Sequence, residues 1–524
     1  MVSVRAKTGA LVVLTSMAMA ACTTGGNETE SPTEAKVSIA MVGDPSTLDP
    51  HKSTPAHELM MARMMFDTLV RRDDGGKMIA GLAKSWTVTP TSGEFVLRDD
   101  VTCADGTKLT ATTVAKSMTR FADPKTGATA AGQVFGTANL GKATFTGDDA
   151  ASKLTVKLDQ PWADLIFGLS LPQAGVICDK GLTDEAALKA GTKGVGTGPY
   201  FLAGDSAVQK GVSYTLTGRP EYKWAPVYAR MPSGKVPTTV VMKVILKEDV
   251  MANELLANNL DYGGITGPDI ARLPAKDFNI KPAPLIRAFV VFNQRPGRPG
   301  ADPAFRKAFA QAIDRTAFNQ AVTRGTGTLM AGITDPAVPC ANKDESLLVK
   351  PDAAAAKAGL TGKKVKIVGH TAVAAGAPAE YALTALKAAG ADAELRNVDL
   401  ATWTNDVFSN KGDWDVTVLT NLNLTNMLTP PAALLIGSAP EGTPPGRNFG
   451  AIQNPAFARA FGMAMAAPDP TAQCAAWGEA QKALLEQVNV IPLAAINVNY
   501  VTTKRATGSD PDGIFDPTTM RVVG

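Results

Sequence analysis

The sequence predicts an α/β protein built of two or more lobes. A chain of 524 residues exceeds the size at which a single hydrophobic core keeps growing. After Pro351, strand patterns and helix patterns alternate, which is typical of a largely parallel sheet. The hydrophobic fraction of 45% and the charged fraction of 19% are those of a globular protein with a sizeable core.

The amino-terminal residues have the pattern of an export signal. Basic residues precede an apolar run over residues 11–19 that is too short to span a bilayer comfortably. The small residues before Cys22 resemble the bacterial lipobox, in which this cysteine becomes the lipidated first residue of the mature chain. We therefore expect a signal peptide over residues 1–21 and a lipidated, flexible tether over residues 22–35. The alternative is an ordinary signal peptide with a chance cysteine.

Short strands and helices are expected in the first half of the mature chain. Residues 37–42 read as a strand that a turn-rich segment closes. A helix is expected over residues 58–70, with a methionine stripe that packs into the core. Residues 95–98 form a short strand pattern, and Thr110 is expected to cap a helix that runs to Phe121.

A well-marked helix begins at Asp302, where a proline suits the first helical turn. Phe305, Phe309 and Ile313 recur every four residues and give this helix one apolar face. Gly325 lies past its expected end.

The segment after Pro351 alternates between the two kinds of pattern. Strands are expected over residues 365–368, 393–398, 415–419 and 498–502, and helices over 379–389 and 471–488. Residues 430–448 are rich in proline and glycine and are expected to form a surface or cleft loop.

The chain has five cysteines, and setting Cys22 aside leaves an even number for an oxidising compartment. No CxxC or Cys/His spacing suits zinc, so disulfides are favoured over a metal site. The residue spacing alone leaves three pairings open. The cysteines concerned are Cys103, Cys178, Cys340 and Cys474.

The charge pattern excludes some classes of partner. A formal net charge of +3 over this length is nearly neutral, and no basic patch with interleaved aromatic residues points to nucleic acid. No second long apolar run follows the export signal, so a lipid on Cys22 would be the only membrane attachment.

The sequence offers little for catalysis. Its three histidines are His51, His57 and His370, and no GxSxG, HExxH or phosphate-binding loop motif occurs. A metal pair at His51 and His57 is conceivable, but a turn residue and a surface histidine are favoured. We therefore expect a binding protein without cofactor or metal. A membrane-anchored hydrolase and a plain structural lipoprotein are the alternatives from other classes.

Several short segments resemble the solute-binding proteins of ABC importers, in the class that takes peptides, nickel and related solutes. These segments fall in one order over nearly the whole mature chain, and the ordered set is far more specific than any one of them. They are PSTLDPH at 45–51, FDTLV at 66–70, GLAKSW at 81–86, LR at 97–98, DGTKLTA at 105–111, GTGPY at 196–200, PAFRKA at 303–308 and AIDR at 312–315.

The resemblance implies a two-lobed periplasmic-binding-protein-like fold with an extra subdomain inserted in the first lobe. Lobe I is expected over residues 36–285, with the insert at about 67–165, lobe II over 286–495 and a return to lobe I over 496–524. The ligand is then held between lobes that close around a hinge. The implied function is capture of a peptide or peptide-like solute by a monomer outside the cytoplasm, and delivery to an ABC permease with its ATPase. A nickel or metal-chelate binder is the alternative within the family.

The resemblance also gives a disulfide pairing. It assigns Cys103 and Cys178 to the first lobe with its insert, and Cys340 and Cys474 to the second lobe. A bridge between the lobes would obstruct their closure. We therefore expect Cys103–Cys178 and Cys340–Cys474.

The ligand-binding residues are expected near the interlobe site that the resemblance implies. They are Thr54, Asn421, Asn423, Thr425 and Arg447. Peptide binders of this class often place an aspartate after the strand equivalent to residues 416–418, but here no carboxylate occurs between Asp415 and Glu441. We therefore expect weak binding of a ligand's free ammonium group and better binding of acidic or amino-blocked ligands. The alternative is that the asparagines only satisfy the backbone of their loop.

Overall fold

The computed structural model describes residues 35–73, 75–128, 130–442, 446–510 and 515–523. Cys22, the expected signal peptide and nearly all of the expected tether lie outside the described residues. Within the described ranges, no helix combines the length and the apolar character needed to cross a membrane.

One mixed sheet organises the fold. Over the described residues it contains 12 strands, hydrogen-bonded in the order β16-β15-β17-β13-β18-β12-β1-β11-β10-β8, with β14 on β18 and β9 on β10. Their bounds are β1 (Lys36–Met41), β8 (Tyr200–Leu202), β9 (Val208–Gln209), β10 (Ser213–Gly218), β11 (Thr239–Val244), β12 (Tyr262–Ile265), β13 (Phe278–Phe292), β14 (Thr328–Leu329), β15 (Lys364–His370), β16 (Asp392–Val398), β17 (Val416–Leu422) and β18 (Val490–Thr503).

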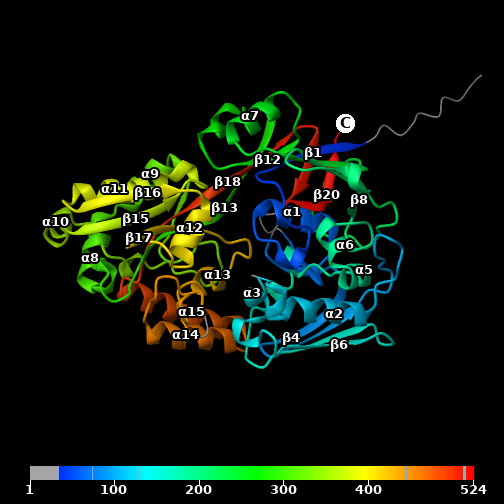
Figure 1. Cartoon of the computed structure of the whole chain (residues 1–524), viewed down its shortest axis with the longest axis horizontal. Helices are drawn as coiled ribbons and strands as arrows, with labels where there is room; N and C mark the ends of the chain where they lie inside the picture. Colours follow the sequence, from blue (N-terminus) through cyan, green and yellow to red (C-terminus); the bar gives the residue numbers. More distant parts are fainter. Residues whose placement is uncertain (1–34, 74, 129, 443–445, 511–514, 524) are drawn as a thin grey trace, which may run out of the picture. The chain divides into compact units, whose positions relative to one another are not determined.

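Two long antiparallel strands, β13 and β18, connect the two ends of this sheet. They pair from Phe278 opposite Thr503 to Val291 opposite Val490. β12 pairs with the end of β18, and β17 pairs with the end of β13. The two strands therefore run from the neighbourhood of β12 to that of β17 (Figure 1). Their register shifts between Ala283 and Ile286, beside prolines that cannot donate a backbone hydrogen bond.

The sheet contains two groups of parallel strands, one of them in the segment after Pro351 where the alternation predicts it, and it ends in the antiparallel strands β10 and β8. β15 pairs in parallel with β16 and β17, and β1 pairs in parallel with β11 and β12. The helices are α1 (Ala56–Met65), α2 (Ala111–Ala122), α3 (Ala131–Phe135), α4 (Leu165–Gly168), α5 (Asp179–Thr183), α6 (Glu185–Ala190), α7 (Glu248–Leu256), α8 (Pro303–Ala312), α9 (Arg315–Thr323), α10 (Ala353–Leu360), α11 (Ala377–Ala388), α12 (Leu400–Trp403), α13 (Thr429–Ala432), α14 (Pro455–Ala466) and α15 (Pro470–Glu486).

A second, antiparallel sheet forms within the segment expected as an insert. Its strands lie in the order β4-β5-β7-β6. Their bounds are β4 (Ala83–Thr89), β5 (Ser92–Leu97), β6 (Thr144–Asp148) and β7 (Lys153–Lys157), and the short pair β2 (Val70–Arg72) and β3 (Met78–Ala80) precedes them. Helix α2 begins where the sequence predicts, because the Thr110 hydroxyl accepts a hydrogen bond from the Thr113 N–H at 3.2 Å.

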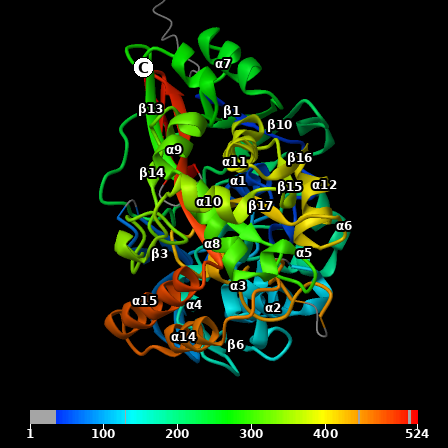
Figure 2. The same ribbon diagram turned by 90° about the vertical axis from the view of Figure 1, so that its left-hand side faces the viewer.

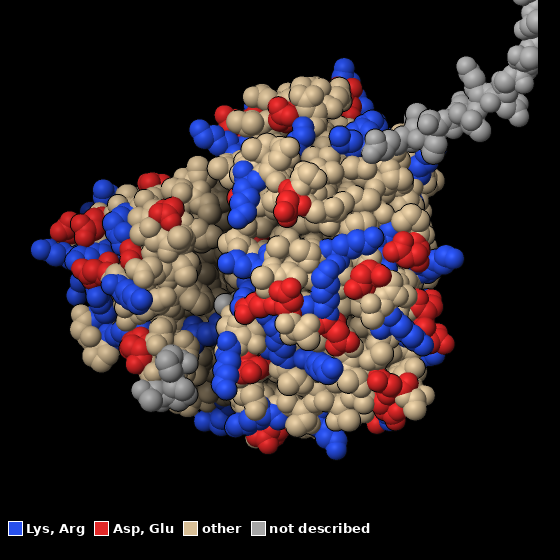
Figure 3. All heavy atoms as spheres, turned by 45° about the vertical axis from the view of Figure 1, so that its right-hand side comes forward, with Lys and Arg blue, Asp and Glu red and all other residues tan. Residues whose placement is uncertain are grey.

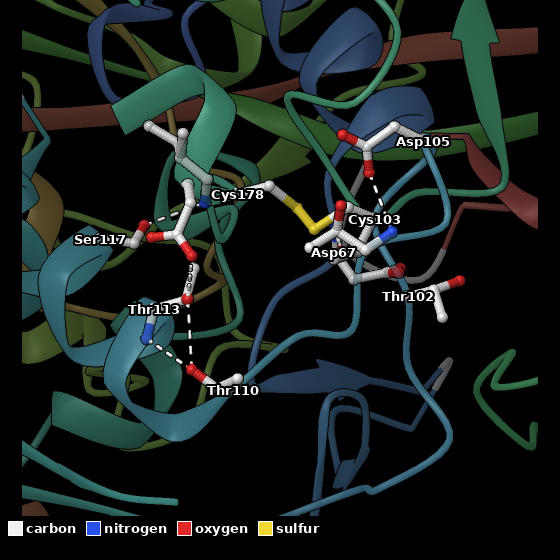
Figure 4. Close-up of a disulfide and its surroundings, with 12 residues drawn as sticks. Asp67, Thr102, Cys103, Asp105, Thr110, Thr113, Ser117 and Cys178 are labelled. Atoms are coloured by element: carbon white, nitrogen blue, oxygen red, sulfur yellow. Dashed lines mark hydrogen bonds between the residues drawn. A yellow bond between two sulfur atoms is a disulfide. The ribbon is translucent and has the colours of Figure 1, made fainter. Parts of the chain in front are cut away.

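The disulfide Cys103–Cys178 joins the loop before α2 to the start of α5, with Cα atoms 6.3 Å apart (Figure 4). Hydrogen bonds from α2 reach the same place. The Thr113 hydroxyl donates to Asp179 Oδ2 at 2.8 Å, and the Ser117 hydroxyl accepts from the Ile177 N–H at 2.9 Å. The bridge therefore closes a region that side-chain hydrogen bonds already hold together.

The second disulfide, Cys340–Cys474, ties the loop after β14 to the first turns of α15, with Cα atoms 4.7 Å apart. Beside it, the Gln481 side-chain amide donates to the Cys340 carbonyl at 2.9 Å. The structure thus forms the two disulfides in the pairing that the family resemblance implies.

Two expected helices end earlier than the sequence predicts. Helix α1 stops at Met65 and not at Val70, since the Met65 carbonyl accepts from the Gly198 N–H and the chain turns into β2. The helix from Asp302 stops at Ala312, because the Asp314 carboxylate accepts hydrogen bonds from two N–H groups and caps a new helix, α9. A carboxylate in that position starts a helix rather than continuing one.

The chain does not end with the strand expected at residues 498–502. β18 is longer than that pattern, and it is followed by the hairpin strands β19 (Ala506–Ser509) and β20 (Asp516–Val522). The expected loop at 430–448 begins inside the short helix α13, and its remaining described residues are irregular.

The insert packs against the helix pair α14 and α15. The Trp162 and Phe461 rings lie 6.4 Å apart between centroids, and the Ala163 N–H donates to the Met465 carbonyl at 2.9 Å. Figures 1 and 2 show these helices beside the insert. On the face in Figure 3, Lys and Arg side chains are interspersed with Asp and Glu, in keeping with a formal net charge of +3.

Candidate functional site

Polar side chains join the insert to the segment that follows β17. The Asp164 carboxylate accepts from the Gln473 side-chain amide at 3.0 Å through Oδ1 and from the Thr429 hydroxyl through Oδ2. Nearby in the same contact, the Arg72 guanidinium donates to the Thr425 carbonyl. Residues of the first third of the chain thus meet residues of its last quarter here.

Asp164 is the unusual member of this contact. Its side chain is 2% exposed, and it forms no ion pair within the described part of the chain. Burial raises the pKa of Asp164 to about 6, although the hydrogen bonds from Thr429 and Gln473 pull it down. Two neutral donors therefore compensate only part of the cost of burying this carboxylate.

A small cavity of about 10 Å³ adjoins Asp164. This is room for about one water-sized group. The lining combines residues of the insert and α4 with residues of the loop after β17 and of α13. They are Gln133, Asp164, Gly168, Thr425, Met427, Thr429 and Pro430.

The loop after β17 is held in shape by its own asparagine. Asn423 is fully buried, and its amide donates to the Met427 carbonyl at 2.6 Å while its Oδ1 accepts from the Thr425 hydroxyl at 3.0 Å. Its backbone N–H donates to the Leu285 carbonyl. These contacts are those of a residue that shapes a loop, and they present Thr425 to the cavity.

A buried ion pair lies beneath this loop. The Arg287 guanidinium contacts Asp335 at 2.7 Å, and both side chains are almost fully buried. Arg287 also donates to the Asn423 carbonyl at 2.7 Å and to Asn426 Oδ1 at 2.6 Å. The ion pair therefore fixes where the loop leaves β17. Burial lowers the pKa of Arg287, and the Asp335 charge opposes that effect.

Two buried oxygens near this ion pair make no hydrogen bond to any residue that the structure describes. Asn421 lies opposite Arg287 in the β13–β17 pairing, and its Oδ1 has no partner. The Thr334 hydroxyl, next to Asp335 in sequence, is fully buried and has none either. Such groups are expected to be satisfied in the functioning molecule.

The five residues expected to bind ligand are not gathered in one place by the contacts of the structure. Asn423 and Thr425 touch each other, and Asn421 precedes them on β17. Thr54 is exposed, and its N–H donates to Glu58 Oε2 at 3.1 Å. The Arg447 guanidinium lies over the Phe408 ring at 5.9 Å, and burial lowers its pKa.

A further polar residue lies beside the expected group. The five expected residues include no carboxylate, and the cavity that Thr425 lines is also lined by Asp164. The sequence analysis misses Asp164 because it lies about 260 residues before Thr425, in a segment without a recognisable motif. Only the packing of the insert on the later segment brings the two together.

A larger cavity lies elsewhere and contains none of the expected ligand-binding residues. Its volume is about 610 Å³, and it lies between the α8–α9 junction, the segment 345–351, the end of α15 and the start of β18. It does not touch the contact between the insert and the later segment.

His51 has the contacts of a structural residue. His51 is fully buried, stacks on Phe121 at 4.6 Å, and contacts the Arg120 guanidinium through Nδ1 at 2.9 Å and the Gly175 carbonyl through Nε2 at 3.2 Å. Burial lowers the pKa of His51 well below its usual value. Within the described ranges, no three His, Cys, Asp or Glu side chains are grouped so as to hold a metal ion.

The sequence is similar to a family of known proteins and to one of its described members. The model of the bacterial extracellular solute-binding proteins, family 5 Middle, matches residues 77–439. The periplasmic murein peptide-binding protein MppA of Escherichia coli (strain K12) is 26% identical over 496 residues, which cover 86% of this chain and 86% of that protein.

Solved structures share the fold. A substrate binding protein from Microbacterium hydrocarbonoxydans, complexed with 4-hydroxybenzoate hydrazide, is 33% identical with a TM-score of 0.81, over 93% of this chain and 100% of that one. Haemophilus influenzae OppA, in complex with the peptide RPPGFSPFR, is 19% identical with a TM-score of 0.75, over 94% of this chain and 99% of that one. The described chain thus has the two-lobed fold that its sequence motifs resemble.

Proposed function

Since the chain belongs to family 5 of the bacterial extracellular solute-binding proteins, we propose that it captures a peptide or peptide-like solute between two lobes and delivers it to an ABC permease. The family and the relatives named above are binding proteins, and the proposal includes no chemistry on the ligand. MppA is named for murein peptides, and the Microbacterium protein holds a hydrazide, a small amide-like solute. Both kinds of ligand carry amide groups.

The observation that carries the proposal is the pair of connections between the two ends of the main sheet. The strands β13 and β18 cross between them, with a register shift between Ala283 and Ile286. The second connection consists of non-covalent contacts, polar and apolar, between the insert and the segments after β17. A hinge on one side and a non-covalent contact that can open on the other are what capture by closure requires.

The lobe bounds are part of the proposal. We place lobe I at residues 36–285 with its insert at about 67–165, lobe II at 286–495, and the return to lobe I at 496–524. The irregularity between Ala283 and Ile286 supports the first boundary, because a hinge needs a few residues that absorb a backbone change.

Membrane attachment is also proposed. The family is extracellular. We infer that a lipid on Cys22 anchors the chain at the outer face of the cell membrane through the tether over residues 22–35, and that the protein acts as a monomer. The support is the sequence pattern at residues 11–22.

The direct test is retention of ligands from a peptide mixture. The purified protein would be incubated with a tryptic digest of casein, separated from free peptides by gel filtration, and its retained peptides identified by mass spectrometry. We expect a subset of peptides at a 1:1 ratio to protein. Retention of Ni²⁺ or its histidine chelate, with no peptide, would favour the nickel-binding alternative and contradict the proposal.

A further inference from the structure

Asp164 has a chemical environment that its protein partners leave incomplete. The carboxylate is 2% exposed and receives hydrogen bonds from two uncharged groups, the Thr429 hydroxyl and the Gln473 amide. Two other buried carboxylates of the described chain have a cationic partner. Asp67 pairs with Arg71, and Asp335 pairs with Arg287.

The cavity beside Asp164 has room for one more hydrogen-bond donor. The cavity of about 10 Å³ opens directly on Asp164. Its polar lining residues come from both sides of the contact, with Gln133 on α3, Thr425 on the loop after β17 and Thr429 at the start of α13. A group the size of one water fits there, so the cavity suits one terminal group of a ligand rather than a whole molecule.

The chemistry of the cavity selects among such groups. A buried carboxylate without a cation is costly, and an N–H donor, above all a charged one, reduces that cost. A carboxylate or a carbonyl oxygen placed there would face the Asp164 charge without a proton to share. A methyl group would leave the carboxylate as poorly compensated as before. A terminal amino group, which is small and offers several N–H donors, matches the space and the charge.

We propose that Asp164 is the specificity-determining acceptor for a terminal amino group of the ligand. This inference rests on the proposed function and names the end of the solute that the insert recognises. It replaces the expectation that the site grips a free amino group weakly. Because Asp164 also holds Thr429 and Gln473, the amino group would bind at the contact where the insert meets the later segment.

The test uses two pairs of probes that differ only in a blocked amino group. One pair is a tryptic digest of casein and the same digest after N-acetylation. The other is 4-hydroxybenzoate hydrazide and its N′-acetyl derivative. Retention or calorimetric affinity is measured for the wild type, for Asp164→Asn and for Asp159→Asn. Asp159 is an exposed carboxylate of the same segment, 3.9 Å from Lys142, and serves as the matched control.

We expect the wild type to prefer the free form at least tenfold in one pair or both, Asp164→Asn to lose that preference, and Asp159→Asn to keep it. A further variant, Gln133→Lys, would place a protein ammonium beside Asp164 and should lower the affinity for free-amino ligands at least tenfold. If thermal unfolding shows that Asp164→Asn does not fold, the Gln133→Lys variant decides whether Asp164 accepts the amino group of the ligand.

The outcomes separate the inference from the function on which it rests. If the wild type retains no peptide from either digest, the proposed peptide function fails and the hydrazide pair alone decides the inference. A wild type without preference for the free amine in either pair, or one that binds no amine probe, overturns the inference. So does a preference that survives in both Asp164→Asn and Gln133→Lys.

Discussion

Arg287 and Asp335 form an ion pair at 2.7 Å with both side chains at 2% exposure or less. The same guanidinium donates to the carbonyls of Leu285 and Asn423 and to the Asn426 side chain. One buried charge pair therefore holds both Leu285, beside the register shift in β13, and the loop after β17. Loss of this ion pair should therefore disturb both β13 at Leu285 and the loop after β17.

The first prediction concerns this pair. Asp335→Asn leaves Arg287 buried without its counter-charge, which should lower the free energy of unfolding by about 3–5 kcal/mol. Asp100→Asn is the control, because Asp100 pairs with Arg98 at an exposed site and should cost less than about 1 kcal/mol. Urea unfolding measures both. Equal effects of the two substitutions would contradict the assigned role of Arg287.

The second prediction is a pH dependence from His370. Its side chain is 7% exposed, its Nε2 lies 2.7 Å from the Thr420 hydroxyl, and burial lowers its pKa from 6.5 to about 4. Between these values the unfolded chain binds a proton that the folded chain does not. Stability therefore falls as the pH drops from about 6.5 to 4, by on the order of 3 kcal/mol for this group.

The His370→Gln variant should lose less stability than the wild type over that pH range. Asp164 contributes with the opposite sign, since burial raises its pKa to about 6 and so favours the folded chain as the pH falls toward 4. The comparison of variant with wild type removes that contribution, because both proteins carry Asp164. Identical pH profiles of unfolding would count against a neutral, buried His370.

The third prediction concerns the disulfides. Replacing both cysteines of either bridge by serine should cost on the order of 3–5 kcal/mol in the free energy of unfolding by the loop-entropy model. The bridges close loops with sequence separations of 75 and 134 residues, so the model makes the second larger by only about 0.5 kcal/mol. Denaturant unfolding with and without reductant checks this. Unchanged stability in either double variant would refute its stabilising role.

The fourth prediction concerns the amino terminus. If Cys22 is lipidated, the mature protein begins at this residue, carries the mass of a diacylglyceryl group, and sediments with membranes. Cys22→Ser should release the chain from the membrane fraction while leaving ligand retention unchanged. Mass spectrometry of the membrane fraction is the measurement. A mature protein that begins at another residue would contradict lipidation at Cys22.

Local signals explain what the sequence could predict. Thr110 caps α2 and Asp302 caps α8 because their side chains act on N–H groups two or three residues away. The parallel arrangement of β15, β16 and β17 follows from an alternation visible in the sequence. Asp314 carries such a signal too, since its carboxylate caps α9, but the apolar spacing that starts at Asp302 predicts one uninterrupted helix through this position.

The rest depends on contacts between distant residues. Asp164 meets Thr429 across 265 positions and Gln473 across 309, and Arg287 meets Asp335 across 48. No periodicity or capping rule links such positions. The candidate site was therefore predicted in part, on the loop after β17, while the carboxylate facing that loop had to be found in the folded chain.

The central claim is that this protein captures a solute by closing two lobes around it. Small-angle X-ray scattering of the protein, alone and saturated with a peptide that it retains from the casein digest, tests that claim most directly. We predict a smaller radius of gyration in the presence of the peptide, with no change for a peptide that is not retained. A radius that stays the same while the peptide is bound at a 1:1 ratio would contradict capture by closure.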